Sequence, residues 1–223
     1  MKYYALIVAG GSGTRMGTVI PKQFLMLNEK PVLMHTIQAF YMSSLKPEII
    51  LVLNIDYHQY WEKLCADHRF DIPHILVKAG SQRFYSVKNG LKHIKGKAIV
   101  AVHDAVRPLV SEKLITQSFR EAELNGNAVC AVQASDSVRR QIGKSTERLN
   151  REEIFLVQTP QTFESATLKK AYEQPYRVAF TDDASVVETS GQRITLIPGE
   201  KTNLKITYPE DILIAQLFLT DKK

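Results

Sequence analysis

The 223-residue sequence has few cysteines and no long apolar run. Cys65 and Cys130 lie far apart among apolar neighbours, which excludes a disulfide-stapled scaffold and a cysteine-based metal cluster. No segment approaches the roughly 20 consecutive apolar residues that a membrane helix needs. The N-terminus also lacks a signal-peptide cleavage pattern. We therefore expect a cytoplasmic protein with no membrane partner.

The charge is positive but is not gathered into basic runs. Lysine and arginine number 29 against 23 acidic residues, which gives a formal net charge of +6. Nucleic-acid-binding proteins usually combine clustered cations with interleaved aromatic residues, so we expect no nucleic-acid partner. A scattered positive charge suits a small phosphorylated substrate. The apolar share of 44% excludes a disordered protein, and the length predicts a single domain over residues 1–223.

Short apolar runs alternate with amphipathic segments as far as Gln133. The expected strands are Tyr3–Val8, Glu48–Asn54, His74–Lys78, Ala98–His103 and Ala128–Gln133, and the expected helices are Pro31–Met42, Asp56–His68, Phe84–His93 and Ser111–Asn125. This alternation predicts an α/β fold with a mostly parallel sheet and helices on both faces. Ligands of such sheets bind beyond the carboxyl ends of the strands, so the loops that follow the strands are the candidate site.

The pattern changes at residues 135–155, which are polar and charged, with Gly143 near the middle. We interpret this segment as a protruding β-arm, and the alternative is a long solvated loop. Loops longer than roughly 15 residues are uncommon in compact domains and are usually functional. Beyond it, the pattern predicts a strand at Phe155–Val157, helices at Glu164–Glu173 and Asp182–Thr189, a strand at Arg193–Pro198 and a last helix from Pro209.

A glycine-rich loop, Ala9–Gly17, follows the first expected strand, and Pro21–Phe24 comes shortly after it. Glycines let a backbone approach a phosphate closely, and Arg15 and Lys22 add two cations. The loop lacks the lysine of a Walker sequence, and Met16 replaces the third glycine of a dinucleotide fingerprint. The remaining interpretation is a nucleotidyltransferase loop that binds a nucleoside triphosphate. The alternative is a glycine turn with two surface cations.

A carboxylate, Asp104, follows His103 at the end of the fourth expected strand. At that position it can hold Mg²⁺, which typically takes one or two protein carboxylates together with phosphate oxygens and water. The alternative is that Asp104 caps the turn or pairs with Arg107. We expect His103 to be a packed histidine, because no second histidine lies close to it in the sequence.

Other segments carry weaker signals. The Gly80–Val87 loop could contact a base or ribose, although Ser81 could also be a simple helix N-cap. Thr181–Ser185 opens an expected helix, and N-capping alone would explain it. Arg151 and Lys205 are basic residues for which surface exposure is the ordinary state.

In their order and spacing these segments resemble the 2-C-methyl-D-erythritol 4-phosphate cytidylyltransferases, the CTP-using enzymes of the non-mevalonate isoprenoid pathway. The resemblance covers nearly the whole chain and rests on Ala9–Met16, Pro21–Phe24, Gly80–Ser86, His103–Pro108, Gln158–Gln161, Thr181–Ser185 and Asn203–Thr207. It implies a Rossmann-like sheet with a β-arm at about 135–155 that clasps a second subunit, hence a homodimer. It also implies transfer of CMP from CTP to methylerythritol phosphate, with Mg²⁺ as the cofactor.

The resemblance also implies a role for each matching position. Arg15 and Lys22 correspond to the catalytic pair that stabilises the transition state, and Asp104 corresponds to the magnesium ligand. The positions that match the nucleotide-binding site are Ala9, Gly10, Gly11, Gly13, Gly80, Arg83, Ser86 and Asp104. Those that match substrate-positioning residues are Arg107, Ser137, Arg151, Thr159, Thr181 and Lys205.

Three positions depart from the family pattern. Ser137 stands where a threonine is common, which keeps the hydroxyl. Val106 stands where alanine is more frequent, and valine also occurs in the ribitol-5-phosphate cytidylyltransferases. Lys201 lies close to where some members place an acid, so no second metal ligand is expected there. Two alternatives stay open: a ribitol-5-phosphate cytidylyltransferase, and a catalytically inactive nucleotide-binding regulator.

Overall fold

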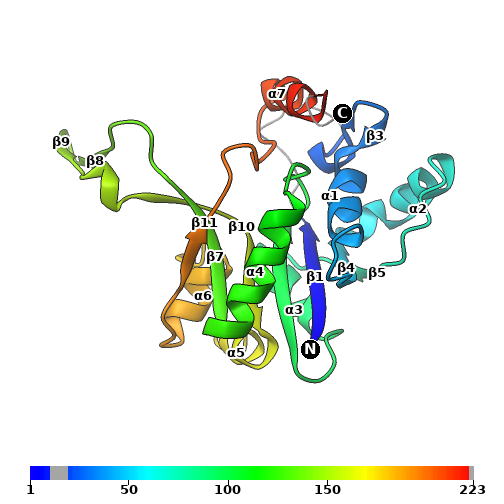
Figure 1. The fold of residues 1–223 in the computed structure, drawn as a ribbon, viewed down its shortest axis with the longest axis horizontal. Helices are drawn as coiled ribbons and strands as arrows, with labels where there is room; N and C mark the ends of the chain where they lie inside the picture. Colours follow the sequence, from blue (N-terminus) through cyan, green and yellow to red (C-terminus); the bar gives the residue numbers. More distant parts are fainter. Residues whose placement is uncertain (11–19, 221–223) are drawn as a thin grey trace.

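The computed structural model describes residues 1–10 and 20–220, and its centre is a seven-stranded sheet (Figure 1). The strand order is β11-β7-β10-β6-β1-β4-β5. The strands are β1 (Lys2–Ala9), β4 (Glu48–Leu53), β5 (Ile75–Lys78), β6 (Ala98–Asp104), β7 (Asn127–Gln133), β10 (Phe155–Glu164) and β11 (Leu196–Pro198). The five strands predicted up to Gln133 are all present, with ends that differ by one residue at most.

Most neighbouring strands run parallel, as predicted. β1 pairs in parallel with β4 and β6, β4 with β5, and β11 with β7. Only β10 is antiparallel in this sheet, and it lies between β6 and β7. The carboxyl ends of β1, β4, β5 and β6 therefore meet at one rim of the sheet.

Strand β10 is longer than the sequence predicted. It runs through Glu164, whereas the apolar pattern indicated a strand only at Phe155–Val157. Its register on β7 shifts between Val157 and Gln161, where polar residues interrupt the apolar alternation. Those polar side chains are buried and hydrogen-bonded, as when Gln158 donates to the backbone oxygen of Glu200 at 2.9 Å. The edge strand β11 is shorter than predicted and begins only at Leu196.

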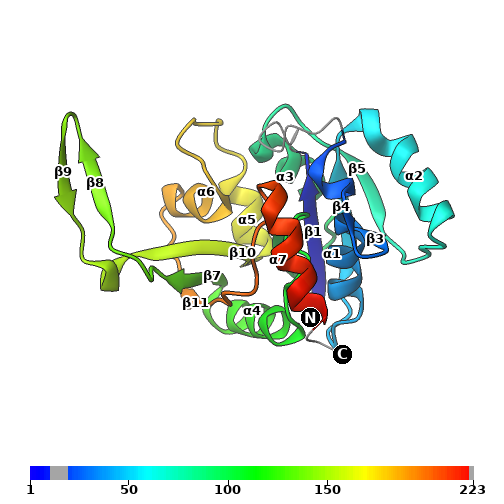
Figure 2. The ribbon, with the colours of Figure 1, turned by 90° about the horizontal axis from the view of Figure 1, so that it is seen from above.

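Helices cover both faces of the sheet, which confirms the predicted architecture (Figure 2). They are α1 (Val32–Tyr41), α2 (His58–Asp67), α3 (Arg83–Leu91), α4 (Glu112–Asn125), α5 (Ser165–Ala171), α6 (Asp183–Thr189) and α7 (Pro209–Thr220). Apolar residues of α1, α2 and α4 share one core cluster, and those of α3, α5 and α6 share another. Alternate residues of β1 point into the two clusters: Ala5 and Ile7 into the first, Leu6 into the second.

The two ends of α4 illustrate how local sequence sets an element's bounds. The Ser111 hydroxyl accepts a hydrogen bond from the backbone N–H of Leu114 at 3.0 Å, which caps the first turn. Such a cap stabilises a helix by about 1 kcal/mol. Gly126 ends the helix at a φ of 80°, a left-handed conformation that glycine adopts without a steric penalty.

The predicted arm is a two-stranded hairpin that extends away from the main sheet (Figures 1 and 2). Its strands are β8 (Arg139–Ile142) and β9 (Ser145–Arg148), and all of their residues are exposed. Gly143 in the connecting turn has a φ of 57°. The short 3-10 helix η4 (Arg151–Glu153) then leads the chain back to β10. The alternative of an irregular loop is wrong for residues 139–148, although much of the connection on either side is irregular.

A third apolar cluster lies under α7. It joins Ala215 to Leu27, Val32, Leu109 and Ile206, which come from segments next to the rim. The nearby 3-10 helix η2 (Lys22–Phe24) and the small strands β2 (Met26–Leu27) and β3 (Lys30–Pro31) complete this region. None of the helices in the described part of the chain is long and apolar enough to cross a membrane.

Candidate active site

A cavity of about 630 Å³ lies beyond the carboxyl ends of the parallel strands. Six of the predicted nucleotide and catalytic positions line it: Ala9, Gly10, Lys22, Gly80, Arg83 and Asp104. They come from the end of β1 and the residue after it, from η2, from the segment before α3 and its first residue, and from the end of β6. The fold thus brings together residues that are far apart in the sequence. Gly11, Gly13 and Arg15 lie outside the described residues.

A second cavity of about 260 Å³ lies next to the first. It is lined by four predicted substrate-positioning residues, Arg107, Thr159, Thr181 and Lys205. Three residues line both cavities: Arg83, Asp104 and Lys205. The two cavities therefore meet at Asp104, where one ligand could be held against another.

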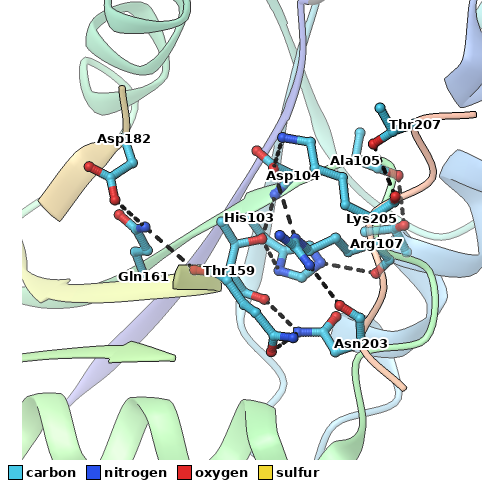
Figure 3. Close-up of polar contacts among 12 residues, drawn as sticks. His103, Asp104, Ala105, Arg107, Thr159, Gln161, Asp182, Asn203, Lys205 and Thr207 are labelled. Atoms are coloured by element: carbon cyan, nitrogen blue, oxygen red, sulfur yellow. Dashed lines mark hydrogen bonds and ion pairs between the residues drawn. The ribbon is translucent and has the colours of Figure 1, made fainter. Parts of the chain in front are cut away.

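Asp104 is a nearly buried carboxylate surrounded by cations (Figure 3). Lys205 Nζ donates to Asp104 Oδ2 at 2.6 Å, Arg83 Nε lies 3.6 Å from Oδ1, and Arg107 Nε lies 3.9 Å from Oδ2. Burial alone would raise the pKa of Asp104, but Arg83 and Lys205 outweigh it and hold the pKa well below its usual range. Asp104 is therefore ionised at neutral pH.

Arg107 is a buried cation that is only partly satisfied. Its Nη1 donates to the backbone oxygen of Asn203 at 2.7 Å, whereas its buried Nε makes no hydrogen bond. Burial lowers the pKa of the Arg107 guanidinium, and the Asp104 carboxylate opposes that shift. A buried donor without a partner costs free energy. Because Arg107 lines the smaller cavity, an anion there could supply acceptors close to this side chain.

His103 is a packed histidine, as predicted. It is fully buried, its Nε2 lies 3.1 Å from the backbone oxygen of Arg107, and its Nδ1 lies 3.1 Å from Thr159 Oγ1. A carbonyl can only accept, so these partners assign the proton to Nε2 and leave Nδ1 to accept from Thr159. Burial lowers the pKa of His103 to about 4, which keeps it neutral at pH 7. Its role here is to position Thr159.

Two glycines allow the chain segments around the larger cavity to approach closely. A Cβ on Gly80 would lie 2.3 Å from Tyr85 Cβ, and a Cβ on Gly10 would lie 3.0 Å from Ser86 Oγ. Ser86 itself is buried, accepts from the N–H of Gly80 at 3.1 Å and donates to the backbone oxygen of Gln82 at 3.0 Å. Its hydroxyl therefore shapes this loop. The alternative of Ser81 as the N-cap is wrong, because Gln82 occupies that position.

The structure confirms that the segment before α6 caps the N-terminus of this helix. The Asp182 side chain accepts from the N–H of Ser185 at 2.9 Å, and Ser185 Oγ lies 3.3 Å from the N–H of Asp182, which together form a capping box. The other carboxylate oxygen of Asp182 accepts from Gln161 at 2.9 Å (Figure 3). Thr181 comes just before this cap and lines the smaller cavity.

Ser137 and Arg151 line neither of the two rim cavities. They lie on the arm, around a separate hollow of about 260 Å³ that Arg148 also lines. Arg151 donates to the backbone oxygen of Ser135 at 3.2 Å and is otherwise exposed. Within this chain, the fold does not bring these two predicted substrate-positioning residues to the rest of the site.

The sequence interpretation missed residues that support the site. Gln23 is buried and its Nε2 donates to the backbone oxygen of Ala9 at 3.1 Å, which ties η2 to the end of β1. Asn54 also lines the larger cavity. Its place directly after β4, at the carboxyl end of a parallel strand, was the available signal. The residues next to Gln23 in the sequence give no indication that its side chain is buried.

The described residues contain no group of three or more histidine, cysteine, aspartate or glutamate side chains that could hold a metal ion. Asp104 alone is a hard oxygen ligand between the two cavities. That donor set fits Mg²⁺, which binds readily through one carboxylate when phosphate oxygens and water supply the rest.

Comparisons with known proteins show which proteins this chain resembles. A family model for 2-C-methyl-D-erythritol 4-phosphate cytidylyltransferase (IspD) matches residues 3–221. A protein of that name from Azobacteroides pseudotrichonymphae is 49% identical, over 97% of this chain and 98% of its own length. One from Bacteroides fragilis is 45% identical, over 96% of this chain and 98% of its own length.

Solved structures of such proteins share the fold. The crystal structure of 4-diphosphocytidyl-2C-methyl-D-erythritol synthase from Anaerococcus prevotii matches with a TM-score of 0.83 at 27% identity, over 98% of this chain and 96% of that one. The 2-C-methyl-D-erythritol 4-phosphate cytidylyltransferase of Thermus thermophilus matches with a TM-score of 0.76 at 27% identity, over 99% and 100% of the two chains. The chain therefore belongs to the 2-C-methyl-D-erythritol 4-phosphate cytidylyltransferase family.

Proposed function

We infer that this protein transfers CMP from CTP to 2-C-methyl-D-erythritol 4-phosphate and releases pyrophosphate. The observation that carries this conclusion is the pair of adjoining cavities at the rim, which share Arg83, Asp104 and Lys205. A reaction between two phosphorylated molecules needs two anion-binding spaces that meet at the reacting phosphorus.

The charges at the junction suit two polyanions. Three cations, Arg83, Arg107 and Lys205, lie within ion-pair distance of Asp104, and Asp183 neutralises part of the charge of Arg83. These three cations against Asp104 and Asp183 leave one positive charge. Lys22 in the larger cavity adds one positive charge, and Asp182 in the smaller cavity adds one negative charge. Opposite charge in a low-dielectric cleft attracts phosphate groups.

In the reaction, a phosphate oxygen of methylerythritol phosphate attacks the α-phosphorus of CTP. The bond from that oxygen to the α-phosphorus forms while the bond from the α-phosphorus to the bridging oxygen of pyrophosphate breaks. The protein supplies alignment and charge neutralisation rather than a covalent nucleophile. Lys22, in the larger cavity, faces the negative charge that develops on the phosphates. The sequence pattern assigns the same role to Arg15, which lies outside the described residues. Lys205 and Arg107 hold the acceptor in the smaller cavity, with Thr159 and Thr181.

Mg²⁺ is the cofactor that Asp104 suits, because Asp104 is the carboxylate that lines both cavities. Asp104 is ionised, and it reaches both cavities. When bound there, the ion would neutralise charge on the phosphate oxygens of CTP. Lys205 occupies Asp104 Oδ2 at 2.6 Å, so the lysine would have to move or share that carboxylate.

The arm supports the proposal of a homodimer. Ser137 and Arg151 are too far along the arm to line the cavities of their own chain. At the base of the arm, β10 begins with Phe155, Leu156 and Val157, which are exposed although they are apolar. Exposed apolar side chains in a row are typical of an interface. In the proposed dimer, Ser137 and Arg151 complete the acceptor side of the partner's site.

The test is an assay of pyrophosphate release with CTP, Mg²⁺ and one acceptor at a time. Methylerythritol phosphate should support release and yield the cytidine diphosphate adduct by mass spectrometry. Excess EDTA should abolish release, and added Mg²⁺ should restore it. Turnover with ribitol 5-phosphate alone would assign the other acceptor, and binding of CTP without release under any condition would favour a nucleotide-binding regulator.

A further inference from the structure

Asp183 is a buried carboxylate that the proposed reaction does not use. It is 0% exposed and is the first residue of α6. The next residues of that helix, Ala184, Val186 and Val187, belong to the apolar core. Burying an ionised carboxylate costs several kcal/mol unless partners compensate it, so its position calls for an explanation.

Two side chains compensate the buried charge. The Tyr172 hydroxyl donates to Asp183 Oδ1 at 2.6 Å, and Arg83 Nη2 donates to Oδ2 at 2.7 Å. Burial raises the pKa of Tyr172 well above its usual value, and Asp183 raises it further, so Tyr172 stays a neutral donor. Burial alone would lower the pKa of Arg83, but Asp183 and Asp104 outweigh it and raise the pKa.

Arg83 connects this buried group to the rim. While Nη2 binds Asp183, Nε lies 3.6 Å from Asp104 Oδ1. The Arg83 side chain is about 30% exposed and lines both cavities. A guanidinium can contact two carboxylates at once because its donors point in different directions, whereas an ammonium is a single point of charge.

Each oxygen of the Asp104 carboxylate therefore faces a different cation, and one of these cations is itself fixed in place better than the other. Lys205 approaches Oδ2 from a side chain that is 39% exposed, whereas Arg83 approaches Oδ1 and is fixed from behind by Asp183. A ligand that draws Lys205 away would leave Arg83 in place. The anchored side would then keep the carboxylate oriented while both cavities are filled.

We propose that Asp183, supported by Tyr172, is a positioning residue that holds Arg83 against Asp104 at the junction of the two cavities. The proposal deepens the inferred cytidylyl transfer and rests on it. Asp183 contacts no substrate itself and acts through Arg83. Small displacements of a group at a reacting centre reduce turnover strongly, whereas they affect the binding of the distant parts of a substrate less.

The kinetic test compares Asp183→Asn, Tyr172→Phe, Arg83→Lys and the double variant Asp183→Asn/Arg83→Lys. Asp183→Asn keeps the shape but removes the charge, and it should lower kcat at least tenfold with less than a threefold change in KM for CTP. Tyr172→Phe should have a smaller effect in the same direction. The double variant should be no worse than Arg83→Lys alone, because residues that act as one unit are not additive.

A matched control separates positioning from stability. Ser165 is a buried residue at the start of α5 whose hydroxyl accepts from the N–H of Ala98 at 3.1 Å. Ser165→Ala should lower Tm without changing kcat per folded molecule. If Asp183→Asn also lowered Tm and left kcat per folded molecule unchanged, or if its effect simply added to that of Arg83→Lys, the positioning role would be overturned.

A second readout does not depend on turnover. The ¹H–¹⁵Nε NMR signal of Arg83, assigned by its loss in Arg83→Lys, should be sharp and slow to exchange with solvent in the parent protein. In Asp183→Asn it should broaden or shift toward the position of a free arginine. An unchanged signal would refute the proposal even if the enzyme is active. The expected change in a protein that turns over no acceptor would instead place the failure in the proposed function.

Discussion

Lys22 is the charged residue of the larger cavity that stands apart from the cluster around Asp104. It begins η2, which the buried Gln23 ties to the end of β1. This attachment places the lysine in the lining of the same cavity as Asp104, Ala105 and Val106 at the end of β6. Charge that is held in position before the reaction contributes more to turnover than to binding.

We predict that Lys22→Ala lowers kcat by about 10²–10³-fold and changes KM for CTP much less, because a preorganised charge acts mainly in the transition state. Steady-state kinetics of pyrophosphate release would measure both constants. Lys97→Ala is a matched control, since Lys97 is an exposed lysine whose Nζ lies 3.6 Å from Glu164. A nearly normal kcat in Lys22→Ala would remove Lys22 from the catalytic machinery.

His103 gives the fold a specific pH dependence. Its pKa is about 4 in the folded protein, against an ordinary value of 6.5, so the unfolded chain binds more protons between these values. Above about pH 6.5 this group leaves stability unchanged, and stability falls as the pH drops toward 4. Between pH 7 and pH 5 the loss should be about 2 kcal/mol.

The measurement is urea unfolding at pH 7 and pH 5 for the parent and for His103→Gln. The variant cannot titrate at this position, so its free energy of unfolding should fall less over the same range. His93→Gln, at an exposed histidine, should keep the dependence of the parent. An identical pH dependence in His103→Gln and the parent would contradict the neutral burial of His103.

At the residue scale, the sequence predicted which side chains gather at the rim but not how they are held. Gly80, Arg83 and Asp104 were expected there because they follow predicted parallel strands, and Lys22 because it is a cation shortly after the glycine-rich loop. The burial of Asp183 could not be predicted, because its partner Arg83 lies 100 positions away. A local pattern at Thr181–Ser185 indicates only a helix cap, and it says nothing about a tertiary ion pair.

The arm is the element that connects the fold to the proposed dimer. Among the described residues, β8 and β9 form a two-stranded sheet of their own, and the residues of both strands are exposed. A two-stranded hairpin is marginally stable alone in water, so a covering partner would stabilise it. Its position beyond the main sheet explains why Arg151 is present in the sequence pattern of the site yet lines neither rim cavity.

We predict that two inactive variants restore activity in one dimer. Lys22→Ala disables the body of a chain, and Arg151→Ala disables the arm that it lends to its partner. When the two variants are co-expressed with different tags, about a quarter of the parent activity should return, because half of the dimers are mixed and each holds one intact site. Activity that stays at the level of the separate variants would contradict the shared site.

At the element scale, periodicity located the strands and helices well where one face or both faces are apolar. It failed on β10, because the polar residues Gln158, Thr159 and Gln161 are buried within that strand. The Gln158 side chain donates to the backbone oxygen of Glu200, and the Gln161 side chain donates to Asp182. The Thr159 hydroxyl bonds to His103 Nδ1 and accepts from the N–H of Asp104, so all of these partners lie far away in the sequence. Burial that depends on such distant partners leaves no alternation in the sequence.

The whole molecule places two adjoining cavities at one rim of the sheet, both lined by Arg83 and Lys205, and an arm beyond the other side of the sheet. The parallel order of β5, β4, β1 and β6 brings the loops that follow them to that rim. β10 and β11 extend the sheet on the other side, toward the arm. In the proposed reaction this arrangement separates the nucleotide side from the acceptor side, with Asp104 lining both cavities.

The central claim is that the larger cavity holds CTP and the smaller one holds the acceptor phosphate, with the α-phosphorus at Asp104. A crystal structure of the protein with CTP and Mg²⁺ tests it most directly. We predict the triphosphate between Lys22 and Asp104, the base beside Gly80, and an open path from the α-phosphorus to Thr159 and Thr181. CTP bound elsewhere, or a triphosphate turned away from Asp104, would contradict this account.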